Sequence, residues 1–67
     1  MMVYHALAGR FHLQSYHETL GIYSTLEKAK AACEKDARQP LRWNGPKDGW
    51  EWWPDGGSHR IRGVEVE

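Results

Sequence analysis

The sequence predicts a small α+β domain, with a single antiparallel sheet of β-β-α-β-β-β order and one helix packed on one face. Three observations predict it. An alanine-rich stretch with helical spacing lies mid-chain, runs of β-branched and aromatic residues lie on both sides of it, and clusters of Gly, Pro and Asp separate these runs. Because the chain has only 67 residues, we expect residues 1–67 to form one domain.

Two strands are expected before the helix. The first is Val3–Phe11, and the second is Tyr16–Tyr23, in which Leu20 and Ile22 share one face. A hairpin turn over residues 12–15 joins them. The pattern of the first strand leaves two sets open for burial, either Val3, His5 and Leu7 or Tyr4, Ala6 and Ala8.

The helix is expected over about Thr25–Gln39. Ser24 and Thr25 both offer an N-cap oxygen, and Glu27 follows Ser24 at the spacing of a capping box. Pro40 ends the helix, because the residue before a proline avoids the helical region. One apolar stripe recurs at helical spacing and should face the sheet: Leu26, Ala29, Cys33 and Ala37.

Three further strands are expected after the helix. They are Leu41–Asn44, Trp50–Trp53 and His59–Val66, separated by a loop over Asn44–Gly49 and a turn over Pro54–Gly57. In the last strand, a bulge at glycine 63 would keep its three aliphatic side chains on the core: Ile61, Val64 and Val66.

Strand parity assigns the two faces of the sheet. The face toward the helix is predicted to hold Leu20, Ile22, Leu41, Trp43, Trp50, Trp52 and Ile61. The opposite face is predicted to hold Tyr23, Arg42, Glu51, Trp53, Arg60 and Arg62. Because two of the four stripe residues are alanine and a lone cysteine excludes an internal disulfide, three tryptophans are expected to supply the missing apolar mass: Trp43, Trp50 and Trp52.

The uncovered face is the candidate binding surface. Guanidinium groups bind phosphate or carboxylate in pairs, and an indole stacks on a base or on a partner's side chain. Both residue types are also enriched in protein–protein hot spots. A plain alternative is a solvated strand face that resists aggregation. The predicted binding residues are Arg42, Trp53, Arg60, Arg62 and Tyr23.

The stretch Leu20–Ala37 consists of a strand ending in Leu-Gly-x-aromatic, then Ser/Thr-x-x-Glu and an alanine-rich helix. With the tryptophan strand, the loop and the closing Arg-Ile-Arg-x-Val-Glu-Val, it is similar to small uncharacterised bacteriophage accessory proteins of β-β-α-β-β type. This resemblance implies a phage protein that acts against host defence, as an inhibitor that binds a host protein or by sequestering a nucleotide-like ligand.

Residues Leu20–Ala37 are also similar to the strand–helix junction of AP2-like domains, including the arm-binding domains of phage integrases. This second resemblance implies a nucleic-acid-binding module as the alternative function. Such domains read DNA from basic strands before the helix, whereas the strands expected here contain only Arg10 among Lys and Arg. The nine Lys and Arg residues also equal the nine Asp and Glu residues, and this balance disfavours nucleic acid.

No enzyme, metal or cofactor is predicted. The four histidines and Cys33 show no paired metal-ligand spacing, and a core-facing cysteine within a helix is a poor nucleophile. The first residues resemble neither a signal peptide nor a membrane span, so we expect a cytoplasmic protein, that of an infected bacterial host if phage-encoded. A sheet with one covered face and two edges favours self-association into a dimer or larger assembly.

Overall fold

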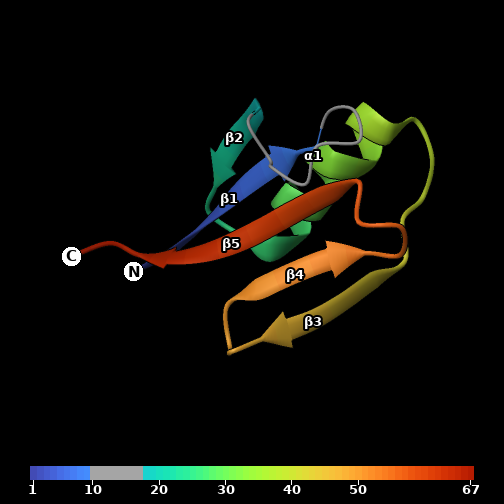
Figure 1. Ribbon diagram of the computed structural model, residues 1–67. Helices are drawn as coiled ribbons and strands as arrows, with labels where there is room; N and C mark the ends of the chain where they lie inside the picture. The colour runs from blue at the N-terminus through green and yellow to red at the C-terminus, as the bar shows by residue number, and fades with distance from the viewer. Residues whose placement is uncertain (10–17) are drawn as a thin grey trace.

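The computed structural model describes residues 1–9 and 18–67. These residues form, in chain order, β1 (Met2–Ala8), β2 (Glu18–Tyr23), α1 (Leu26–Ala37), β3 (Trp43–Lys47), β4 (Glu51–Pro54) and β5 (His59–Glu65). The strands make one antiparallel sheet of order β2-β1-β5-β4-β3, shown in Figure 1. The predicted α+β class and element order are confirmed. The predicted turn over residues 12–15 lies outside the described residues.

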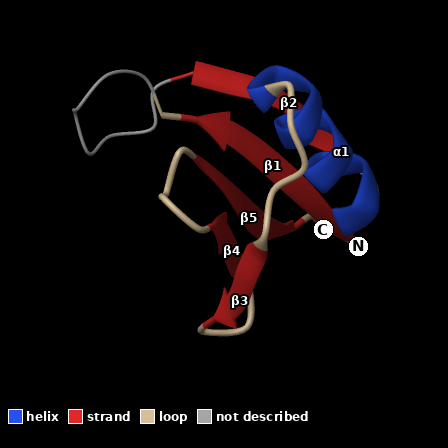
Figure 2. Cartoon of the chain, turned by 90° about the vertical axis from the view of Figure 1, so that its right-hand side faces the viewer, coloured by secondary structure: helices blue, strands red, loops and turns tan. Residues whose placement is uncertain are grey.

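The helix covers only part of the sheet. α1 packs against β1 and β2 and, less extensively, against β5, while the β3–β4 hairpin extends beyond it (Figure 2). We call the side of the sheet opposite α1 the open face. Side chains on this face include those of His5, Thr19, Ile22, Glu51, Trp53, Arg60, Arg62 and Val64.

The centre of the core is built from small side chains. Ala6 of β1, Ala29 and Cys33 of α1, and Ile61 of β5 are fully buried. The predicted helix stripe therefore packs on Ala6 of β1, and these small side chains allow a close approach of helix and sheet. The bulk that stabilises so small a core surrounds this contact as partly buried side chains, namely those of Tyr4, Leu20, Tyr23, Leu26, Leu41, Trp43 and Trp52.

Both helix ends differ in detail from the prediction. Thr25 is the N-cap, and its hydroxyl accepts a hydrogen bond from Lys28 N at 3.2 Å, so the predicted capping box of Ser24 and Glu27 is wrong. At the other end Arg38 adopts a left-handed conformation with φ of 59°. Its N–H donates to backbone carbonyls of the last turn, which ends the helix at Ala37 rather than at residue 39.

The faces of β1 and β2 follow from their register. Tyr4 pairs with Tyr23 of β2, and Ala6 pairs with the core residue Ile61 of β5, so the even residues of β1 face the helix. A register shift in the β1–β2 pairing beside Ala6 sets both Leu20 and Tyr23 against the core. The prediction that Ile22 is core and Tyr23 open is therefore wrong.

Strands β3 and β4 are joined by a tight two-residue turn, where the sequence predicts a longer loop between two strands. Asp48 and Gly49 both have positive φ, 55° and 86°, and Trp50 N donates to Lys47 O at 3.2 Å. These are the features of a two-residue type I′ turn, for which Asp-Gly is a favoured pair. The predicted loop over Asn44–Gly49 is wrong, because β3 continues to Lys47 before this turn.

The predicted bulge at Gly63 is also wrong. The β1–β5 register runs without a shift from Met2–Glu65 to Ala8–His59, so Val64 points to the open face and remains exposed. Gly63 N donates to Trp50 O at 2.7 Å, which places Trp50 beside Gly63 on the helix side. Because α1 does not reach β4, the Trp50 side chain is 54% exposed, and its predicted place in the core is wrong.

Candidate binding surface on the open face

Two arginines and a glutamate from adjacent strands meet on the open face. The register places Arg62 of β5 opposite His5 of β1 on one side and opposite Glu51 of β4 on the other. Arg60 lies two residues before Arg62 and therefore projects from the same face. The strand alternation that predicts this arrangement needs no information beyond the sequence, and the structure brings these side chains together.

Glu51 lies between the two guanidinium groups. Its carboxylate oxygens are 3.8 Å from Arg60 Nε and 4.0 Å from Arg62 Nε. The Arg62 side chain is 56% exposed and that of Glu51 is 22% exposed. At these distances, and with this access to water, the ion pairs contribute little to stability. Glu51 therefore lies between two cations, and the exposed guanidinium of Arg62 can also engage an incoming anion.

Trp53 extends the same face toward the β3 edge. It follows Glu51 by two residues in β4, and its side chain is half-buried. The side-chain amide of Asn44, in β3, donates to Trp53 O at 3.2 Å and to Asp55 Oδ1 at 2.9 Å. These bonds connect β3 to the end of β4 and to the turn that follows it, beside Trp53.

Apolar side chains flank the charged group. Ile22 pairs with His5, and Val64 pairs with Val3, so all four lie on the open face. Ile22 and Val64 are 64% and 44% exposed. His5 Nε2 is also hydrogen-bonded to Thr19 Oγ1 at 2.9 Å. Cations, an indole and exposed aliphatic groups together make a mixed surface of the kind found in binding interfaces.

Two predicted site residues lie elsewhere. Tyr23 packs on the helix side, and its hydroxyl faces Leu20 O at 3.5 Å. Arg42 is exposed just before β3, where its carbonyl accepts a hydrogen bond from Asp55 N at 2.9 Å. Because β4 separates β3 from β5, Arg42 does not join the pair formed by Arg60 and Arg62.

A buried polar cluster escaped the sequence analysis. His59 is 5% exposed, its Nε2 lies 2.8 Å from Asp36 Oδ2, and its Nδ1 lies 2.7 Å from Ser58 Oγ. The burial of His59 follows from strand alternation, because it lies two residues before the core residue Ile61 and therefore projects from the same face of β5. The cluster connects the end of α1 to the start of β5, and we assign it to the scaffold.

The remaining sulfur and metal chemistry is limited. Burial, followed by the charges of Asp36 and Glu34, raises the pKa of the Cys33 thiol to about 12. A thiol with this pKa is protonated at neutral pH and is a poor nucleophile. Within residues 1–9 and 18–67, no three His, Cys, Asp or Glu side chains gather as a metal site would require. The one helix in that part of the chain is too short and too polar to cross a membrane.

The chain was compared with protein-family models, curated proteins and solved structures, and none of them matches it. The resemblances to phage accessory proteins and to AP2-like domains therefore stay predictions from the sequence.

Proposed function

We propose that this protein is a small non-catalytic binding protein that acts as an inhibitor or sequestering protein. Its binding surface is the open face around Trp53, Arg60 and Arg62, and its target is a host protein or a nucleotide-like ligand. The observation that carries the proposal is the placement of both guanidinium groups within 4.0 Å of one glutamate, on a face that α1 leaves uncovered.

The chemistry of this surface suits a partner with an anionic group beside a flat or apolar one. A phosphate or carboxylate would compete with Glu51 for the guanidinium donors, and the indole of Trp53 offers a stacking plane. The exposed aliphatic group of Ile22 adds apolar area on the same face. The groups project from paired strands, so their backbone is already ordered before binding, and the main ordering cost is that of the exposed Arg62 side chain.

The alternative function, an AP2-like nucleic-acid-binding module, has one observation in its favour. The helix packs behind the sheet and leaves an arginine-bearing face open, which is the surface such a module would need. Two facts weigh against it. Glu51 offsets the charge of Arg60 and Arg62, and the formal charge of the whole chain is zero. Phosphate-backbone binding depends on an excess of positive charge.

The proposed function also implies an origin and a cellular location for the protein. A phage-encoded protein that inhibits host defence would act in the cytoplasm of the infected bacterium. We also propose that the protein self-associates, because the sheet formed by residues 1–9 and 18–67 has two edge strands, and Ile22 and Val64 are exposed on its open face. Light scattering at micromolar concentration should give a mass well above the 7.8 kDa of one chain. A mass near 7.8 kDa over a wide concentration range would contradict self-association.

The first test is whether the purified protein carries a ligand. Protein purified from infected cells is heat-denatured, and the supernatant is examined by ultraviolet absorbance and mass spectrometry. A released nucleotide would establish the nucleotide-sequestering form of the proposal. If none is released, the same protein is cross-linked in host lysate to recover a protein target.

The second test locates the binding surface with matched variants. Trp53→Ala and Arg62→Ala should weaken binding of the recovered target by about 1–3 kcal/mol each, as hot-spot residues do. The controls are Trp50→Ala, which removes an exposed indole on the helix side of the sheet, and Lys28→Ala, which removes an exposed cation of α1. Equal losses in both sets would exclude the open face as the site. Binding of generic duplex DNA that weakens steeply with salt would favour the alternative.

A further inference from the structure

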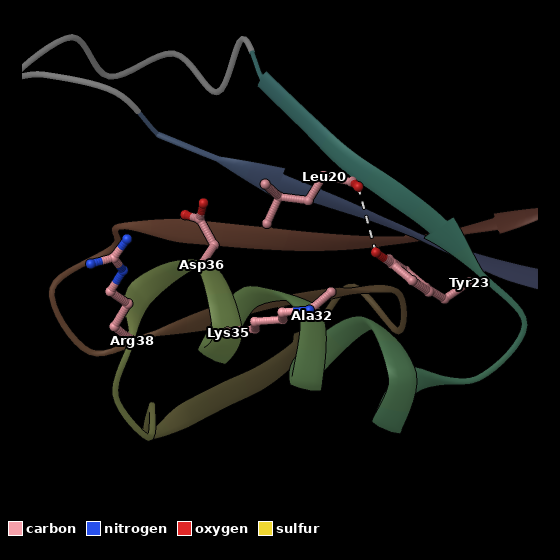
Figure 3. Close-up of a pocket in the computed structure, with 6 residues that line it drawn as sticks. All are labelled: Leu20, Tyr23, Ala32, Lys35, Asp36 and Arg38. Carbon is pink, nitrogen blue, oxygen red and sulfur yellow. Dashed lines mark hydrogen bonds between the residues drawn. The ribbon is translucent and has the colours of Figure 1, made fainter.

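A groove runs between the helix and the outermost strand on the side away from the open face. Figure 3 shows its lining: side chains of β2 form one wall, and side chains of α1 with the residue that caps it form the other. Its volume is about 380 Å³, and it is lined by Leu20, Tyr23, Ala32, Lys35, Asp36 and Arg38. We call this the edge groove. None of its residues contributes to the binding surface proposed above.

The strand beside the groove is an edge of the sheet. β2 stands first in the order β2-β1-β5-β4-β3, so in the described part of the chain it pairs with β1 alone. An edge strand offers backbone N–H and C=O groups along its outer side to a further strand. Extended peptides bind in this way when a sheet edge borders a pocket for alternate side chains, because the backbone supplies affinity and the pocket supplies specificity.

The floor of the groove is apolar and has room. Leu20 and Tyr23 are partly buried against the core, and Ala32 of α1 leaves space opposite them because it ends at Cβ. A bulge beside the core brings both β2 side chains to this wall. An aliphatic side chain of a strand laid along β2 would find apolar contacts on both sides.

The helix wall carries cations. Lys35 and Arg38 are exposed in the last turn and the cap of α1, at the rim of the groove. The one acidic lining residue, Asp36, is engaged with buried His59 at 2.8 Å. The rim therefore complements a carboxylate more closely than a cation, which indicates the charge of the occupant.

From this geometry we propose that the edge groove binds an extended peptide segment of a partner protein. The segment adds to β2 as a sixth strand of the sheet. An aliphatic side chain enters the groove between Leu20 and Ala32, and an acidic side chain two residues further along meets Lys35 and Arg38. The spacing follows from strand geometry, because residues two apart project from the same face.

The test uses isotope-labelled full-length protein and a blocked heptapeptide, Ser-Val-Thr-Val-Thr-Glu-Ser, which carries Val and Glu two residues apart on one face. Amide resonances in β2 and at Ala32, Lys35 and Arg38 should shift on titration, while those of β3 and β4 should not. Two control peptides are titrated alongside. One has Lys in place of Glu, and the other has Pro in place of the central Val, which removes a backbone donor.

Charge reversal in the protein supplies the matched comparison. The double variant Lys35→Glu with Arg38→Glu should weaken peptide binding by about tenfold or more, as loss of a charged anchor does. The control double variant, Lys30→Glu with Lys47→Glu, changes net charge equally away from the groove and should bind as the wild type does. Ala32→Leu, which fills the groove, should also weaken binding, and circular dichroism confirms that each variant is folded.

Several outcomes would overturn the proposal. If the lysine peptide bound as tightly as the acidic one, Lys35 and Arg38 would not recognise a carboxylate. If the proline peptide bound as tightly, the peptide would not pair with β2 through its backbone. Shifts confined to Arg60, Arg62 and Trp53 would move the site to the open face. Inorganic phosphate is titrated as a further control. If phosphate alone caused the same shifts as the acidic peptide, the groove would be an anion site and not a peptide site. No shift with any peptide at millimolar concentration would remove the groove as a binding site, without bearing on the open face.

Discussion

Nε2 of His59, in β5, lies 2.8 Å from Oδ2 of Asp36, in α1. The histidine side chain is 6% exposed and the aspartate side chain 23%. This bond crosses from the last turns of the helix to the central part of the sheet, and it satisfies one nitrogen of a buried imidazole. Ser58 Oγ, 2.7 Å from Nδ1, satisfies the other. A buried polar ring with both nitrogens bonded stabilises a unique packing of helix on sheet.

Asp36→Ala should therefore lower the free energy of unfolding by about 1–3 kcal/mol, because it leaves a buried nitrogen of His59 without its acceptor. Urea denaturation followed by circular dichroism measures the change. Glu27→Ala, an exposed change in the same helix, is the control and should cost no more than about 0.5 kcal/mol. If both variants unfold at the same urea concentration as the wild type, the bond is not a stabilising contact.

The thiol of Cys33 should make the protein sensitive to alkali. Burial raises its pKa to about 12 from an ordinary 9.0, so the folded state holds the proton where the unfolded chain has lost it. The protonated thiol therefore contributes fully to the free energy of unfolding below pH 9. This contribution is lost as the pH rises toward 12, by at most about 1.4 kcal/mol per pH unit.

Urea denaturation at pH 8 and at pH 10.5 tests this, with Cys33→Ala as the reference. The wild type should lose more stability between these two pH values than the variant does, because alanine has no proton to release. Native Cys33 should also react with a thiol reagent far more slowly than the unfolded chain does. Labelling at the rate of a free thiol would contradict the burial of this side chain.

Two of the four tryptophans, Trp52 and Trp50, should differ sharply in their contribution to the free energy of unfolding. Trp52 packs on the core and contacts Tyr4 edge to face, with ring centroids 5.8 Å apart. Trp52→Ala should cost about 2–4 kcal/mol, near the range for aromatic truncation in a core. Trp50→Ala should cost less than about 1 kcal/mol, because its side chain is mostly in water. The melting temperatures of the two variants test this prediction. If Trp50→Ala lowered the melting temperature more than Trp52→Ala does, the assignment of the buried side of β4 would be wrong.

Alanine substitutions at two glycines of the β3–β4 hairpin distinguish the cost of a steric clash from the cost of backbone strain. Both have positive φ, 107° at Gly45 and 86° at Gly49. A Cβ at Gly45 would lie 2.5 Å from the backbone oxygen of Glu51, whereas one at Gly49 would meet nothing within 4 Å.

Gly49→Ala should cost about 1–2 kcal/mol, the strain of a left-handed residue. Gly45→Ala should cost clearly more, because a backbone atom of the neighbouring strand must also move. The difference in unfolding midpoint between the variants measures the clash. Equal midpoints would show that the hairpin yields at Gly45 without cost.

The helix and the element order could be predicted because the information lies close together along the chain. The stripe from Leu26 to Ala37 repeats at 3.6 residues, and Pro40 bounds it, so neighbouring residues alone determine a helix and its buried side. The alternation of Glu51 and Trp53, and of Arg60 and Arg62, is equally local, and it places these side chains on the open face without knowledge of the partner strands. The Asp48-Gly49 turn is equally local, because Asp-Gly is a pair that a type I′ turn favours.

Only the tertiary structure decided which side chains the helix covers and which strands are neighbours. Ile22 and Tyr23 exchanged their expected faces because the register shifts in the β1–β2 pairing, and Trp50 is exposed because α1 does not reach β4. Arg42 stands apart from Arg60 because β4 lies between their strands, and the edge groove exists because β2 is outermost. Each of these depends on contacts between residues distant in the chain. Side-chain alternation within one strand therefore determines two faces, but the pairing and packing of the other elements determine which face is buried.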